Sequence, residues 1–148
     1  MKKAAAILAV VLIVLLLPVL CVRLRIWAQK PMIRRQVMAH QTELTAAAEQ
    51  ALASGDANAA RPAWTRNGFT NRERSAVFYD VSGVGFGSAT CYFGVCYASD
   101  SLPHPYPGME DYDEIAVMFG FRWEEPGGDN GCRIEQIDGN IYYYETWF

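Results

Sequence analysis

CRIEQIDGNIYYYETWF, residues 132–148, contains two runs rich in apolar side chains on either side of Asp138-Gly139. An Asp-Gly pair between such runs is a strong signal for a β-hairpin with a two-residue turn. We therefore expect strands over 132–137 and 140–148. Because the turn fixes the pairing register, it also fixes which side chains share a face of the sheet.

That register places Ile137 opposite Asn140 and turns Tyr143 toward the buried face. The neighbouring tyrosines then point to the other, wetter face. Exposed aromatic side chains can form a recognition patch for a protein or a glycan, although the pattern favours ordinary sheet residues. The candidate partner-binding patch consists of Tyr142, Tyr144 and Phe148.

Three further strands are expected upstream of the hairpin, over 76–81, 86–98 and 115–123. The segment 86–98 carries apolar or small residues on both faces, which favours a central strand covered on each side. The segment 115–123 alternates apolar and other residues in the manner of a half-buried strand. Residues 75–148 thus predict an antiparallel β-meander of about five strands, preceded by a polar connector over 55–74.

A juxtamembrane or stalk helix is expected over 23–54, so the fold class is α+β. Its apolar residues recur at helical spacing, and Ser54-Gly55 supplies a stop signal at its C-terminus. The apolar stripe consists of Ile33, Val37, Leu44, Ala48 and Ala51. The stripe suits a stalk or a helix that lies on the sheet; a basic helix resting on the membrane is the alternative.

A charge-free run, AAAILAVVLIVLLLPVLCV, extends from Ala4 to Val22 after a short tail over 1–3. As a helix it would span roughly the ~30 Å hydrocarbon core of a bilayer. The run is too long for most cleaved signal peptides, and bulky residues around Cys21 disfavour both cleavage and a lipoprotein motif. We expect a retained single-pass transmembrane helix, with Cys21 as an ordinary apolar residue.

The charges on the two sides of this anchor conflict over its orientation. Five basic residues follow the run within 23–35, and the positive-inside rule would then place the C-terminal domain in the cytoplasm. A short Met-Lys-Lys head before a long apolar run instead resembles a signal-anchor, which exports the domain C-terminal to it. We favour an extracytoplasmic domain at the cell membrane.

Charge is divided unevenly along the chain, whose net charge is −3. Residues 1–54 hold seven Lys/Arg against two acids, whereas residues 55–148 hold six against fourteen. An acidic domain repels phosphate backbones, so nucleic acid is not an expected partner. The basic segment instead predicts contact with membrane lipid through residues 4–35.

No catalytic, cofactor or metal site is predicted. Cys91 and Cys96 fall on opposite faces of one strand, so unpaired core cysteines are favoured over a disulfide to Cys132 or a metal site. His40 and His104 lack neighbouring ligand patterns and are interpreted as surface residues. The acidic run at 110–114 lacks the order of a calcium loop and is interpreted as a solvated loop. The glycines at 83–87 precede a strand, so they form no phosphate-binding loop.

Several structural motifs support a resemblance: the Met-Lys-Lys apolar head, Ser54-Gly55-Asp56, Tyr92-Phe93-Gly94 and the ending from Gly128 through Glu145. In this layout the chain resembles small membrane-anchored proteins of Gram-positive bacteria. The resemblance implies a location and a fold, but no activity.

The sequence thus favours a single-pass membrane protein whose small, exported domain binds a partner at the cell envelope. The alternative is a small envelope enzyme or ligand-binding domain with a pocket between helix and sheet.

Overall fold

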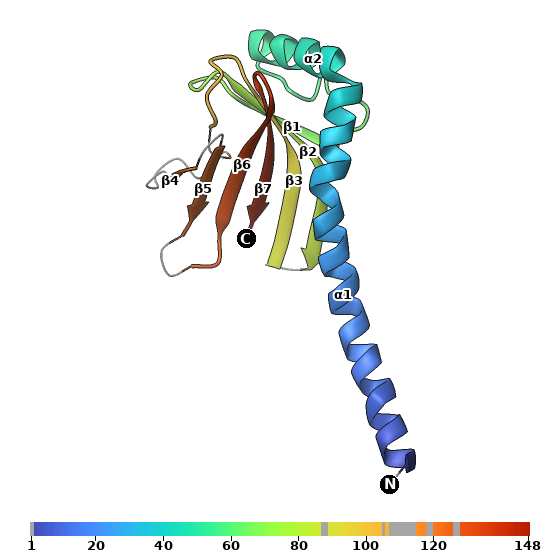
Figure 1. Ribbon diagram of the computed structural model, residues 1–148. Coiled ribbons are helices and arrows are strands. Elements are labelled where there is room, and N and C mark those ends of the chain that lie inside the picture. The colour runs from blue at the N-terminus through green and yellow to red at the C-terminus, as the bar shows by residue number, and fades with distance from the viewer. Residues whose placement is uncertain (1, 87–88, 105, 107–114, 118–119, 126–127) are drawn as a thin grey trace.

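The computed structural model describes the backbone of residues 2–86, 89–104, 106, 115–117, 120–125 and 128–148, and within the first helix it describes side chains from Val14 onward. Two helices and an antiparallel sheet make up these residues, which confirms the expected α+β class. Helix α1 (Lys2–Ala39) runs along one side of the sheet, and its N-terminal half extends well beyond it (Figure 1).

Helix α1 continues through Pro31 and ends at Ala39, and α2 (Gln41–Ser54) begins after a break at His40. Gly55 ends α2 in the left-handed conformation, at φ +80°, and donates its N–H to the Ala51 carbonyl oxygen at 2.7 Å. Glycine adopts this conformation without a steric penalty, so the predicted stop signal is confirmed.

The predicted apolar stripe is also confirmed. All five of its residues are fully buried, and they pack against side chains of the sheet. Of the two expectations for this segment, the helix therefore lies on the sheet rather than on a membrane surface between residues 33 and 51.

The described residues form a sheet of seven strands rather than about five. Their bounds are β1 (Asn67–Asn71), β2 (Ala76–Phe86), β3 (Ala89–Ala98), β4 (Ile115–Val117), β5 (Gly120–Glu124), β6 (Gly131–Asp138) and β7 (Ile141–Trp147). Strand β1 lies within the predicted connector. Its sequence, Asn-Gly-Phe-Thr-Asn, has weak intrinsic β preference, and pairing with β2 overrides that preference.

The strand order β1-β2-β3-β7-β6-β5-β4 corrects the expectation of a simple meander. After β3 the chain crosses to the far edge of the sheet and then returns strand by strand, so that β7 closes beside β3. Strand β3 is thereby central, as its two apolar faces predicted.

The hairpin exists where Asp-Gly predicted it, but its register is different. Asp138 pairs with Ile141, which leaves Gly139 and Asn140 in the turn, and Gly139 has φ +48°. A bulge at Ile137 then shifts the pairing, so Ile134 lies opposite Tyr144 rather than Tyr143. One extra residue in a strand moves every later side chain to the opposite face.

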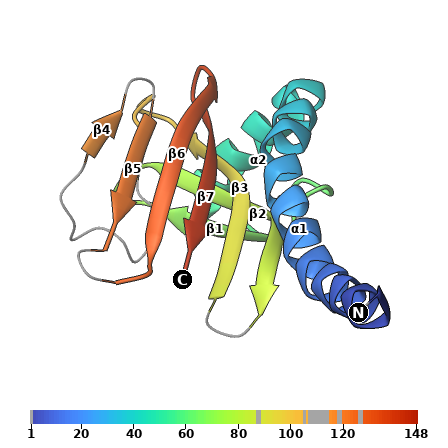
Figure 2. The ribbon, with the colours of Figure 1, turned by 60° about the horizontal axis from the view of Figure 1, so that its bottom comes forward.

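Both faces of the sheet are buried. Helices α1 and α2 cover one face, where Tyr79, Phe93 and Tyr143 pack against the apolar stripe. On the other face Phe78, Tyr144 and their neighbours form a second cluster, against which Tyr106 packs. Figure 2 shows the strong twist of the sheet, with both helices on the β2–β3 side.

Candidate functional site

Between Val14 and Val22, helix α1 presents apolar side chains on every side. Four consecutive residues, Val14 to Leu17, are 63%, 64%, 60% and 57% exposed. Successive residues point about 100° apart around a helix, so no face of this segment packs on the domain. Within the part of the chain that the structure describes, no helix is both long and apolar enough to count as a membrane-crossing segment.

Of the predicted span Ala4–Val22, the structure describes side chains only from Val14 onward, and those of residues 4–13 lie outside the described residues. From residue 14 to Val22 the large apolar side chains are all exposed. The next turns of α1 carry the exposed Arg23 and Arg25, followed by Trp27, which is 85% exposed.

A groove of about 400 Å³ lies between α1 and β2. Its helix wall includes Arg25 and Gln29, and its opposite wall includes Trp64, Arg66 and Ser82. Ser82 donates its hydroxyl to the Gln29 amide oxygen, and Gln29 donates its amide to the Arg25 carbonyl oxygen at 3.0 Å. These bonds occupy the polar groups of Ser82 and Gln29, and they leave the guanidinium groups of Arg25 and Arg66 lining the groove.

A second groove, of about 380 Å³, lies between α1 and the β6–β7 pair. This groove has both positively and negatively charged side chains around it. Lys30 on α1 forms an ion pair with Glu135, and Glu135 also pairs with Arg133. Burial raises the pKa of Glu145 in its wall, and the nearby Arg133 guanidinium opposes that rise. Ion pairing within the wall consumes most of the charge that a ligand could use here.

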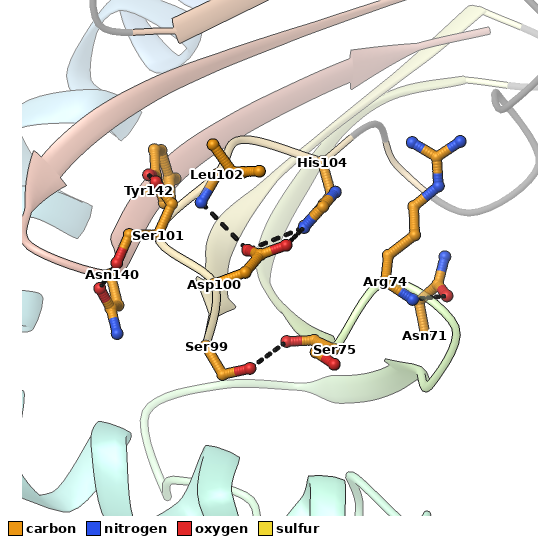
Figure 3. Close-up of polar contacts among 10 residues, drawn as sticks. All are labelled: Asn71, Arg74, Ser75, Ser99, Asp100, Ser101, Leu102, His104, Asn140 and Tyr142. Atoms are coloured by element: carbon orange, nitrogen blue, oxygen red, sulfur yellow. Dashed lines mark hydrogen bonds and ion pairs between the residues drawn. The ribbon is translucent and has the colours of Figure 1, made fainter.

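The loop after β3 contains a carboxylate–imidazole pair that the sequence did not suggest (Figure 3). The Asp100 carboxylate lies 2.8 Å from the Nε2 atom of His104 and accepts the Leu102 N–H at 3.0 Å. His104 is only 8% exposed, so the expectation that it lies on the surface is wrong.

This pair has no nucleophile beside it among the described residues. The Ser99 hydroxyl donates to the Ser75 carbonyl oxygen at 3.2 Å, and the Ser101 hydroxyl donates to the Asn140 side chain. Tyr142 donates its hydroxyl to the Ser101 carbonyl oxygen at 2.6 Å. The contacts in Figure 3 therefore tie the loop to β7 and lack the arrangement that nucleophilic catalysis needs.

The candidate patch is not an exposed patch. Tyr142 and Tyr144 are 2% and 0% exposed, because β7 is covered on both faces. Phe148 is 39% exposed and stacks edge-on against Tyr92, with ring centroids 6.1 Å apart. A run of apolar and aromatic residues without alternation, Ile141 to Tyr144, is itself the signal of a strand buried on both sides.

A buried polar pair lies on the face away from the helices. Tyr144 donates its hydroxyl to the Asp80 carboxylate, and both residues are nearly inaccessible to water. Burial raises the pKa of Asp80, while hydrogen bonds from Tyr144 and Asn67 oppose the rise. Burial also raises the pKa of Tyr144 well above its usual value.

All four cysteines are free, as expected. Cys96 and Cys132 are buried, and burial raises the pKa of both thiols, that of Cys132 to about 12. Neutral, enclosed thiols are poor nucleophiles and poor metal ligands. Among the described residues no group of His, Cys, Asp and Glu is placed to hold a metal ion, and the acidic run 110–114 lies outside those residues.

Comparison with known proteins gives no relative: no family model matches the sequence, and neither a curated protein nor a solved structure matches it.

Proposed function

We propose that the chain is a single-pass membrane protein, in which Ala4–Val22 crosses the bilayer and the α+β domain is held at the membrane surface to bind a partner. The observation that carries the proposal is the ring of exposed apolar side chains from Val14 to Leu17. An all-round apolar helix without a packing partner in its own chain requires an apolar environment from elsewhere.

The residues that flank the charge-free run support the same assignment. The charge-free run is followed at once by Arg23 and Arg25 and then by an exposed Trp27. Basic and aromatic residues of this kind are typical of the membrane–water interface.

The test is alkaline carbonate extraction of membranes that contain the full chain. We expect the wild-type chain to stay in the membrane pellet. Changing Leu15 and Leu16 to lysine should release it, because each lysine at mid-span costs about 2.5–3.5 kcal/mol of insertion free energy. The matched control is Leu102→Lys, which makes the same chemical change at an exposed position of the domain. Release of the wild-type chain by carbonate would refute the anchor.

Orientation is tested separately, with a reporter that is active only outside the cytoplasm fused after Phe148. We propose an extracytoplasmic domain, so the reporter should be active. A silent reporter on a membrane-bound chain would place the domain in the cytoplasm and leave the anchor intact.

A second candidate function is ligand binding between helix and sheet, and the two grooves beside α1 favour it. Neither groove brings together an acid, a base and a nucleophile. Binding is therefore better supported than catalysis.

A further inference from the structure

Two unpaired cationic groups distinguish the groove between α1 and β2. Arg25 lines its helix wall and Arg66 lines the opposite wall. Within the described part of the chain, neither guanidinium group forms an ion pair or a hydrogen bond, and no acidic residue lines the groove. Guanidinium groups bind phosphate oxygens through paired N–H donors, so this donor set suits a phosphate.

The wall of the groove adds further donors. Strand β1 pairs with β2 only as far as Asp80, whereas β2 continues to Phe86. From Val81 onward, β2 therefore has an edge without a partner strand on that side in the described sheet, and such an edge presents free N–H groups. Trp64 also lines the groove, and its buried indole N–H has no acceptor among the described residues.

The position of the groove along α1 identifies the source of the phosphate. At about 1.5 Å per residue, Arg25 lies about 4–5 Å beyond the end of the apolar run at Val22. The headgroup layer of a bilayer is about 5–7 Å thick on each side of the hydrocarbon core. If Ala4–Val22 fills that core, Arg25 stands at the level of lipid phosphates, and Trp27 lies at the same interface.

The groove between α1 and the β6–β7 pair has no such unpaired cationic groups among its described residues. Lys30 and Arg133 in it are already paired with Glu135, and Glu145 adds a carboxylate to its wall. The two carboxylates balance the two cations, so an anion gains no net attraction there, and the two sides of α1 differ in what they can bind.

We propose that the groove lined by Arg25 and Arg66 binds the phosphate of an anionic phospholipid and thereby fixes the domain against the bilayer in one orientation. This inference rests on the proposed membrane anchor and adds a lipid ligand to it. Val81 and Val84 add apolar surface to the groove that the lipid can contact.

The test uses the full chain in detergent micelles and counts bound phosphatidylglycerol by native mass spectrometry. We expect wild-type protein to retain one phosphatidylglycerol, with phosphatidylcholine bound at least tenfold more weakly. Arg66→Gln should weaken phosphatidylglycerol binding at least tenfold. The matched control is Arg72→Gln, which removes the same charge from an exposed position beside Gly55 at the α2 end of the domain, and it should change binding less than twofold.

Each alternative outcome overturns the inference in a recognisable way. Equal weakening by Arg66→Gln and Arg72→Gln would mean attraction by overall charge only. Displacement of the lipid by millimolar inorganic phosphate would identify a soluble phosphate compound as the occupant. Wild-type protein that binds phosphatidylglycerol and phosphatidylcholine equally, yet resists carbonate extraction, would refute the lipid site and leave the membrane anchor intact. Circular dichroism of both variants checks that the fold is unchanged.

Discussion

Replacing Tyr144 with phenylalanine removes one buried hydroxyl and leaves the ring in place. The hydroxyl donates to the Asp80 carboxylate, which is itself 4% exposed. A hydrogen bond to a charged group contributes about 1.5–3 kcal/mol to stability. We expect Tyr144→Phe to lower the free energy of unfolding by that amount at neutral pH.

Tyr79 provides the matched control. Its ring is equally buried, but among the described residues its hydroxyl has no hydrogen-bond partner, and burial raises its pKa to about 12. Tyr79→Phe removes an unsatisfied polar group, so stability should stay the same or increase by up to about 1 kcal/mol. Urea unfolding of the full chain in detergent, followed by tryptophan fluorescence, measures both variants.

The effect of pH gives a second check on the pair. Because burial raises the pKa of Asp80, the folded state binds the proton more tightly than the unfolded chain. Stability from this group therefore falls as pH rises from the unfolded value of 3.8 through the folded pKa. Tyr144 opposes the rise in pKa, so the loss caused by Tyr144→Phe should be larger at pH 7 than at pH 4. Equal costs for the two tyrosine variants, or a cost independent of pH, would refute the role of the pair.

Three further predictions concern packing and thiol reactivity. Leu44→Ala should cost about 2–5 kcal/mol of unfolding free energy because Leu44 is fully buried, whereas the exposed Leu102→Ala should change it by less than about 0.5. Gly94→Ala should destabilise by about 1–3 kcal/mol or more in the same assay, since a Cβ there would overlap the Tyr79 carbonyl oxygen and the ring of Tyr144. A thiol reagent should modify Cys91 before Cys96 in the folded domain, because Cys96 is buried whereas Cys91 is partly exposed; equal rates by mass spectrometry would contradict the burial.

The elements that local sequence determines could be predicted. Helical spacing identified the buried stripe from Ile33 to Ala51, and Gly55 identified the end of α2. Asp138-Gly139 located the hairpin, because turn chemistry is a local property. Strand β1 could not be predicted in this way, since its pairing with β2 is a tertiary interaction.

The candidate patch is buried because the face of the sheet that carries Tyr142 and Tyr144 is itself covered. The bulge at Ile137 moves Ile134 opposite Tyr144 but leaves both tyrosines on the face away from the helices, where a second buried cluster encloses them. The Asp-Gly turn signal does not say whether the outer face is covered; the unalternating run Ile141 to Tyr144 does.

The grooves beside α1 were also beyond local prediction. Arg25 and Arg66 are far apart in the sequence, and only the packing of α1 on β2 brings them to one groove. The sequence did predict contact between residues 4–35 and lipid, which stays a prediction.

Bilayer burial of the apolar run is the central claim, and site-directed spin labelling of the full chain in lipid vesicles tests it most directly. Single labels are placed from Val14 to Trp27 in a chain whose reactive Cys21 and Cys91 are replaced by alanine. We predict that labels at Val14 to Leu20 all collide with oxygen and exclude a water-soluble nickel chelate, with the reversal between Arg23 and Trp27. Nickel accessibility that rises and falls every three to four residues along Val14 to Leu20 would contradict the claim, because it would show one face of the helix on protein and the other in water.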